Sequence, residues 1–186
     1  MTEKISLFET PLWISFLNLD TDSLEREVKI FSFKKESSKM SNIGGYQGHE
    51  FNNKKLMSSI VNSLPLKAGT NLESFRIYSW VNINKSGDRN ERHSHLNTNI
   101  FLSGVYYIKV PENSGNIRFY DPRGHLTQEF LDYKYFYNGY SYHYITPQKN
   151  MLLLFPCWVE HDVEENSSNE ERISISFNIT CDELQQ

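Results

Sequence analysis

Apolar residues recur at helical spacing in two stretches of the first 70 residues. The first stretch, residues 20–37, begins with Asp and Ser residues that can cap a helix, and its apolar positions are Leu24, Val28 and Phe31. The second stretch, residues 51–64, has its apolar positions at Phe51, Leu56, Ile60 and Leu64. Because a proline disfavours helical backbone at the preceding residue, the second helix should end before Pro65. The glycine-containing residues 41–50 are expected to form a loop between the two helices.

From residue 72 onward the pattern changes to that of strands. In residues 73–83 apolar and polar positions alternate, which predicts one face with Phe75, Ile77 and Val81 and an opposite face with Arg76, Tyr78, Trp80 and Asn82. Further strands follow at short intervals, separated by Gly, Pro and Asn turns: residues 99–110, 115–121, 140–146, 150–156 and 171–180. Residues 151–155, MLLLF, are apolar without alternation, which is typical of a strand covered on both faces.

The order of these elements predicts the fold class. Helices followed by many short strands indicate an α+β fold whose main body is a β sandwich or jelly roll. At 186 residues the chain is long enough for one domain with a full core. We therefore expect a single domain over residues 1–186, with a mostly helical N-terminal support in residues 1–70 and the jelly-roll core in residues 71–182.

Composition argues against several classes of function. The net charge is −4 and the charged residues are spread along the chain, so nothing resembles the basic surface of a nucleic-acid-binding protein. The two cysteines lack CxxC spacing, which argues against a disulfide framework and favours a reducing compartment. No stretch approaches the roughly 20 apolar residues that span a bilayer. We expect a soluble, cytoplasmic protein, for which a homodimer through the N-terminal helices would be ordinary.

Three histidines fall near predicted strand ends. His93 and His95 lie two positions apart, immediately before the strand predicted over residues 99–110. If the chain is extended there, odd-numbered residues share a face, so the two imidazoles would project together with Tyr107. His161 follows an apolar strand and a proline-containing turn. The remaining histidines lack this spacing and are expected to be structural or exposed: His49, His125 and His143.

One face of the last predicted strand carries an unusual set of polar residues. Alternation places four of them on one face, Arg172, Ser174, Ser176 and Asn178, and Ile173, Ile175, Phe177 and Ile179 on the other. An arginine and two serines in a row are costly to bury unless they have a partner. A planar guanidinium with a serine hydroxyl nearby is well suited to binding a carboxylate through two hydrogen bonds.

Taken in order, the segments HSHLN, SGVYYI, DPR, LLLFPCWVEH and RISISFN resemble the 2-oxoglutarate/Fe(II)-dependent dioxygenase superfamily. The resemblance is closest to an uncharacterised group of 2OG-Fe(II) oxygenases near the prolyl-hydroxylase-like branch, whose members begin with something like LFETPLW. It covers most of residues 72–180 and the helical N-terminus only weakly. Each motif is common alone, but the set in this order and spacing is specific. The resemblance implies a double-stranded β-helix, a cupin-like jelly roll, with the N-terminal helices packed on the sheet.

The resemblance also implies roles for individual residues. His93 and His161 would be the two histidine ligands of Fe(II). Arg172 would bind the distal carboxylate of the cosubstrate 2-oxoglutarate, assisted by Ser174 and by the hydroxyl of Tyr107, although a tyrosine in an aromatic strand can equally be core packing. The implied reaction oxidises a C–H bond of an unidentified small-molecule or macromolecular substrate with O2, usually as hydroxylation, and releases succinate and CO2.

His95 departs from the superfamily pattern, which normally has Asp or Glu at this position to complete a site of two histidines and one carboxylate. Three imidazoles can hold Fe(II) on one face, but they leave more positive charge on the metal. We favour His93, His95 and His161 as the metal ligands. Alternatively, two histidines could hold the metal while His95 only hydrogen-bonds nearby. The pair could also be His95 with Asn97, or a carboxylate such as Asp88 or Glu91 could join the site.

Three other functions remain open at this stage. A cupin-like dioxygenase with a three-histidine iron site would not use 2-oxoglutarate, and it would leave Arg172 unexplained. A non-catalytic jelly-roll binding module would make the three histidines coincidental. A zinc hydrolase would suit three histidine ligands but lacks a general base at a familiar spacing. In the oxygenase interpretation, the tyrosine-rich residues 121–142 are a candidate lid that selects the substrate.

Overall fold

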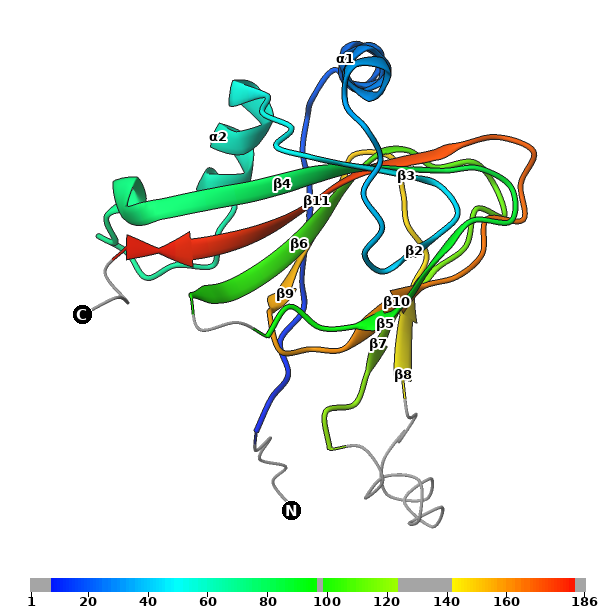
Figure 1. Ribbon diagram of the computed structural model, residues 1–186. Coiled ribbons are helices and arrows are strands. Elements are labelled where there is room, and N and C mark those ends of the chain that lie inside the picture. The colour runs from blue at the N-terminus through cyan, green and yellow to red at the C-terminus, as the bar shows by residue number, and fades with distance from the viewer. Residues whose placement is uncertain (1–7, 97–98, 124–141, 183–186) are drawn as a thin grey trace.

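Two antiparallel sheets face each other, and two helices cover the outer face of the larger sheet (Figure 1). This architecture, seen in a computed structural model, is described for residues 8–96, 99–123 and 142–182. It agrees with the predicted α+β jelly roll with helices packed on the sheet. The candidate lid lies largely outside the described residues, as do His125 and the start of the strand predicted over residues 140–146.

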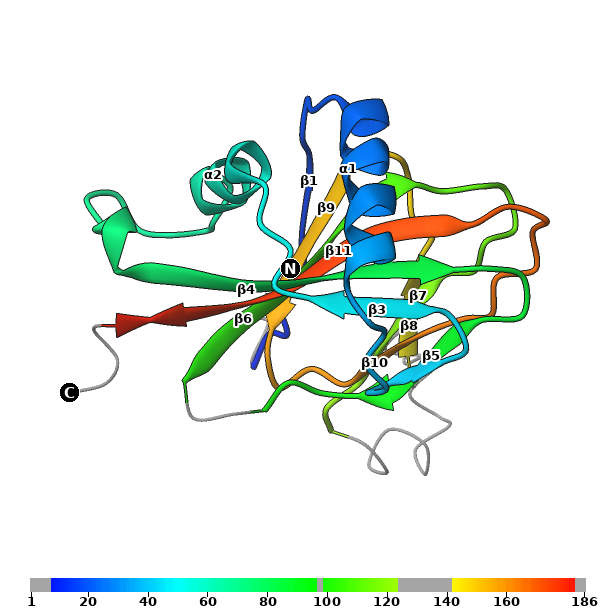
Figure 2. The same ribbon diagram turned by 45° about the horizontal axis from the view of Figure 1, so that its top comes forward.

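The larger sheet has six strands and the smaller sheet has five. In spatial order the larger sheet consists of β1 (Trp13–Phe16), β9 (Met151–Pro156), β6 (Ile100–Lys109), β11 (Arg172–Cys181), β4 (Phe75–Asn84) and β3 (Tyr46–His49). The smaller sheet consists of β2 (Asn42–Ile43), β5 (Arg89–His93), β10 (His161–Val163), β7 (Ile117–Tyr120) and β8 (Tyr142–Ile145). A short 3-10 helix, Leu72–Ser74, precedes β4. The long strands β4, β6 and β11 form the centre of the larger sheet (Figure 2).

Both predicted helices are present. They are α1 (Thr21–Lys34) and α2 (Lys54–Asn62), and the second ends before Pro65 as expected. Each begins at a residue whose side chain accepts a hydrogen bond from the backbone of the first turn: Asp20 from Ser23 at 3.0 Å and Asn53 from Leu56 at 2.9 Å. No helix in the described ranges is long and apolar enough to cross a membrane.

The strands β6, β9 and β11 of the larger sheet are mostly buried on both faces. The outer face of this sheet packs against the helices through apolar residues that alternate along the strands, among them Val81, Ile173, Ile175, Phe177 and Ile179. Its inner face meets the smaller sheet through a second cluster that includes Val105, Tyr107, Phe119 and Phe155. Every residue of β9 is buried, which confirms the expectation drawn from its unbroken apolar run.

Three strand regions were not predicted, and one of them is the short strand β10, which lies where only a turn after the apolar strand was expected. Residues 41–50 were expected to be a loop, but they form the strands β2 and β3 around Gly44 and Gly45, whose φ angles of +70° and +65° suit glycine. The strand β5 was not predicted because its sequence, RNERH, has no apolar alternation. It is a strand because it pairs with β2 on one side and with β10 on the other.

Candidate active site

Three histidines meet at one end of the space between the sheets. His93 ends β5 and His161 begins β10, and the two residues lie directly opposite each other in the antiparallel pair. His95 lies two residues beyond β5, where its backbone N–H donates to the carbonyl of Cys157 at 2.9 Å. One ligand atom from each of these histidines lies within 4.8 Å of the other two. This spacing allows all three to bind one metal ion.

Hydrogen bonds set the proton position on two of the three rings. The Nδ1 atom of His93 lies 2.7 Å from the carbonyl oxygen of Glu91, and Nδ1 of His161 lies 3.0 Å from that of Val159. A carbonyl oxygen can only accept, so each Nδ1 carries a proton and donates it. In the neutral ring this leaves the lone pair on Nε2, which is the atom that would bind a metal.

The three rings are neutral at physiological pH. Burial is the main cause, followed by repulsion from the neighbouring imidazoles, and together they lower the pKa of His161 to about 3 and that of His95 to about 4. Burial likewise lowers the pKa of His93. The histidines therefore need not lose a proton before they bind a cation.

In the described part of the chain, the group that could hold a metal ion consists of histidines alone. Neither of the two carboxylates considered as alternatives belongs to it. Asp88 accepts a hydrogen bond from the backbone of Lys85 at 2.6 Å, and Glu91 contributes its backbone carbonyl to orient His93. Asn97 lies outside the described residues. The arrangement can thus supply three nitrogen ligands on one side of a metal and leave the opposite side open.

A buried arginine occupies the other end of the same space. Arg172 opens β11 and is only 1% exposed. Its Nη1 donates to the carbonyl of Ser114 and approaches that of Glu164 at 3.5 Å, whereas Nη2 is buried with no partner among the described residues. Burial lowers the pKa of Arg172, yet a guanidinium stays charged. A buried charge with an unused donor is suited to binding an anionic ligand.

Tyr107 and Ser174 lie beside this arginine. Ser174 of β11 pairs with Tyr107 of β6, and both side chains are buried. Burial raises the pKa of Tyr107 well above its usual value, so its hydroxyl keeps a proton that it can donate. An anion bound by Arg172 would therefore have hydroxyl donors within reach.

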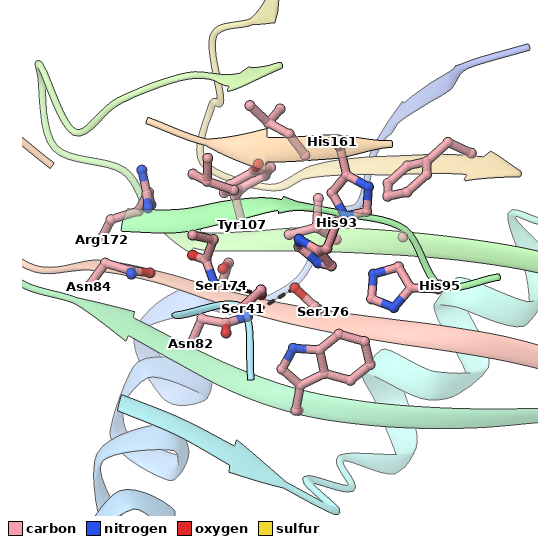
Figure 3. A pocket seen from close by; sticks show the side chains of 17 residues that line it. Ser41, Asn82, Asn84, His93, His95, Tyr107, His161, Arg172, Ser174 and Ser176 are labelled. Carbon is pink, nitrogen blue, oxygen red and sulfur yellow. Dashed lines mark hydrogen bonds between the residues drawn. The ribbon is translucent and has the colours of Figure 1, made fainter. Parts of the chain in front are cut away.

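One pocket contains all six candidate residues: His93, His95, His161, Tyr107, Arg172 and Ser174. Figure 3 shows the three histidines at one end and Arg172 at the other, with Tyr107 and Ser174 between them. The strands that bring these residues together differ from those predicted. His93 belongs to the smaller sheet and Tyr107 to the larger one, so they meet across the sandwich and not along one extended strand.

Several residues that line the pocket were not among the six candidates. Trp80 and Asn82 were expected to share a face with Tyr78, and both line the pocket; Asn82 also donates to Ser176 at 2.9 Å. Tyr78 is 61% exposed and lies further out. Ser41 was missed because it precedes β2 in a segment expected to be a loop. The alternation of apolar and polar residues along β4 and β11 could have indicated the polar residues that line the pocket. No sequence pattern indicated that residues 41–49 would contribute to it.

An outer groove adjoins the pocket on the side of the histidines. The two hollows share Ser41, Trp80, His93 and His95. The groove extends along the inner face of β3 and β4, where it is lined by Gln47, His49, Tyr78 and Trp80, and it includes Asn178 of β11. A molecule lying in this groove would reach the histidines from the side opposite to Arg172.

A jelly roll with three histidines facing a buried arginine fits a class, the metal-dependent oxygenases that bind a dicarboxylate cosubstrate. The particular family follows from sequence comparison. Residues 78–178 match the family model described as "Putative 2OG-Fe(II) oxygenase", which spans more than half of the chain and includes all six candidate residues. The chain belongs to this family. It is a 2-oxoglutarate- and Fe(II)-dependent oxygenase, as its sequence pattern predicted.

Solved structures share the fold at low sequence identity. A prolyl-4-hydroxylase from Pseudomonas putida is 14% identical with a TM-score of 0.67, and the match covers 92% of this chain and 93% of that one. A Trichoplax adhaerens prolyl hydroxylase in complex with a hypoxia inducible factor peptide fragment is 16% identical, covers 94% and 85%, and has a TM-score of 0.65. HygX from Streptomyces hygroscopicus, with nickel and 2-oxoglutarate bound, is 8% identical, covers 92% and 83%, and has a TM-score of 0.61. No curated protein matches the chain by sequence.

Proposed function

We propose that the chain hydroxylates an organic substrate with iron held by His93, His95 and His161 and with 2-oxoglutarate held by Arg172. The observation that carries this assignment is the unpaired, buried Nη2 of Arg172 at the far end of the pocket from the three histidines. A molecule with a carboxylate at each end fits this polarity, because one end would bind the metal and the other would accept hydrogen bonds from the arginine.

The six candidate residues would have different roles. The imidazoles supply neutral nitrogen ligands, and the carbonyls of Glu91 and Val159 hold two of them in orientation. Arg172, with the hydroxyls of Tyr107 and Ser174, would fix the distal carboxylate of 2-oxoglutarate and neutralise its charge in a buried environment. When bound, iron supplies the activation of O2 that couples oxidation of 2-oxoglutarate to succinate and CO2 with insertion of one oxygen atom into a substrate C–H bond.

The unpaired donor of Arg172 also weighs against an iron dioxygenase that ignores 2-oxoglutarate. Such an enzyme would need no anion at the far end of the pocket. The buried guanidinium would then stay short of a partner at a cost of about 1–3 kcal/mol or more.

The test is an anaerobic titration of the purified protein with Fe(II) and then with 2-oxoglutarate. We expect a visible metal-to-ligand charge-transfer band that saturates with 2-oxoglutarate. Arg172→Ala should keep iron binding and lose most of the affinity for 2-oxoglutarate. As a control, Arg76→Ala removes a half-exposed arginine that pairs with Asp182 and should leave the band unchanged. Unchanged affinity for 2-oxoglutarate in Arg172→Ala would contradict the assignment.

A further inference from the structure

The outer groove carries no excess of charge. Its charged side chains are two of each sign: Lys39, Arg92, Glu50 and Glu91. Two of these are already paired, because Glu50 accepts from Lys35 at 2.5 Å and Arg92 is bound to Glu160. Because these charges balance, the groove has no net electrostatic attraction for a strongly charged ligand, and it favours an uncharged molecule.

One buried amide in this groove lacks a partner. Gln47 of β3 is 3% exposed, and its Oε1 has no hydrogen-bond partner within the described ranges. Its Nε2 lies 3.5 Å from Nε2 of His49, and among the described residues this is the one hydrogen-bond contact of the side-chain amide. If the amide were rotated by half a turn, Oε1 could accept from His49 and Nε2 would be unpaired instead. Either orientation leaves one buried polar atom unsatisfied, which is costly without a ligand.

A flat aromatic surface lies next to Gln47. The ring of Trp80 stacks on His49 with centroids 5.9 Å apart, and it lies 5.6 Å from the ring of His95. Gln47 and His49 share a face of β3, and their register partners Asn82 and Trp80 share the same face of β4. The unpaired amide and the indole thus border a path that ends at the metal-binding histidines.

We propose that Gln47 and Trp80 form a recognition site for a planar, uncharged secondary amide of the substrate. Such a group can donate its N–H to the unpaired Oε1 of Gln47, and its plane can lie against an indole ring. This inference rests on the proposed function, because it places the substrate on the side of the histidines away from Arg172. Gln47 would select the substrate and take no part in the oxidation.

Two lactams of nearly equal shape provide the test. 2-Pyrrolidinone has an N–H group and N-methyl-2-pyrrolidinone does not. Saturation-transfer NMR on the protein loaded with Zn(II) and 2-oxoglutarate should show 2-pyrrolidinone binding the more tightly, by about tenfold for one hydrogen bond. Gln47→Met should remove that difference, and Gln148→Met, at an exposed glutamine, should preserve it. With Mn(II) in place of Zn(II), bound 2-pyrrolidinone should show strong paramagnetic relaxation.

Equal binding of the two lactams to the unaltered protein would overturn the inference, as would an absence of binding by 2-pyrrolidinone. A difference that survives Gln47→Met would also overturn it. Failure of the proposed function has a different signature: the lactam preference would persist while Mn(II) caused no relaxation, because no metal would lie near the groove.

His95 differs from the other two histidines in what holds its ring. Its Nδ1 faces the side-chain amide of Asn178, with 3.5 Å between Nδ1 and Nδ2, and among the described residues no backbone carbonyl bonds to that atom. The Oδ1 of Asn178 in turn accepts from the hydroxyl of Ser103 at 2.8 Å. Asn178 and Ser103 are register partners on β11 and β6, so this pair is fixed by the sheet.

The orientation of this amide decides which nitrogen of His95 carries the proton. When Nδ2 faces the ring, Nδ1 must accept, the proton resides on Nε2, and Nε2 cannot bind a metal. After a half turn of the amide, Oδ1 accepts from the protonated Nδ1 and Nε2 becomes free. The hydroxyl of Ser103 serves both orientations, because it can donate to Oδ1 or accept from Nδ2.

We infer that Asn178, supported by Ser103, is a positioning residue that controls whether His95 binds the metal. Titration with Co(II) alone tests this, because the visible absorption of Co(II) reports its ligands. Asn178→Leu should weaken Co(II) binding by about 10- to 100-fold and give a spectrum like that of His95→Ala. Asn178→Asp should restore the affinity, since a carboxylate accepts from both Nδ1 and the serine. In a His95→Ala background, Asn178→Leu should cause no further loss.

Two results would overturn this role: unchanged Co(II) affinity in Asn178→Leu, or an equal loss in the presence and absence of His95. A loss in Asn178→Asp as large as in Asn178→Leu would do the same. Melting temperatures of the metal-free variants identify any general damage to the fold. The proposed function would survive all of these results as long as His93→Ala and His161→Ala still abolish metal binding.

Discussion

Replacing Tyr107 with Phe isolates one hydroxyl of the cosubstrate site. The side chain is 1% exposed, and Phe keeps its shape and apolar contacts. A hydrogen bond to a charged group contributes about 1.5–3 kcal/mol, so Tyr107→Phe should weaken 2-oxoglutarate binding by roughly 10- to 150-fold. Stability should change little, because the substitution breaks no hydrogen bond within the described part of the chain.

The neighbouring residue is a matched control. Tyr106 is also fully buried, but it faces the helices, and its hydroxyl donates to Asn150 at 2.6 Å. Tyr106→Phe should therefore lower the free energy of unfolding by about 1 kcal/mol and the melting temperature by about 2–4 °C, without affecting 2-oxoglutarate. The two variants should show opposite patterns in the charge-transfer titration and in thermal melting. Equal 2-oxoglutarate affinity in Tyr107→Phe and the unaltered protein would refute the role of this hydroxyl.

Other predictions concern the metal, the tyrosine proton and the packing of the sheet. His161→Ala should abolish Fe(II) binding, measured by anaerobic titration, whereas His143→Ala, at an exposed histidine of β8, should not. Zn(II) at about 100 times its dissociation constant should raise the free energy of unfolding by about 2.7 kcal/mol in chemical denaturation, and this gain should vanish in His161→Ala. Burial raises the pKa of Tyr107, so its proton is retained as the pH rises, and 2-oxoglutarate affinity should not fall between about pH 7 and 9; a fall that Tyr107→Phe removes would contradict this. Gly104→Ala should destabilise the protein by about 1–3 kcal/mol in denaturant melts, because a Cβ there would lie 2.5 Å from the Phe177 ring and 2.6 Å from the Leu153 carbonyl oxygen.

The sequence predicted those parts of the site that lie on strongly patterned strands. Alternation along β11 separates Arg172 and Ser174 from the isoleucines that pack under the helices, and the structure has this same division. The two helices were predictable for a similar reason, since apolar spacing and capping residues are local signals. The oxygenase class came from the order of motifs, which the family match confirms.

The parts that could not be predicted depend on contacts between distant segments. The charged strand β5 exists because β2 and β10 supply its hydrogen-bond partners, and its own residues do not indicate a strand. For the same reason, no local pattern could place Gln47 beside Trp80 or Asn178 beside His95. Strand propensity depends on the surroundings that the rest of the fold provides, and these are absent from a short stretch of sequence.

The alternation of β11 also limits how this enzyme can change during evolution. A shift of one residue in its pairing would send Ile173, Ile175 and Phe177 into the cosubstrate pocket and Arg172 under the helices. An insertion or deletion within the strand would thus remove activity and unfold the core in one step. Substitutions on the pocket face alone can alter chemistry while the helix-facing residues keep the strand in place. New activities in this family should therefore arise by exchange of residues along β11 and by changes in length outside it.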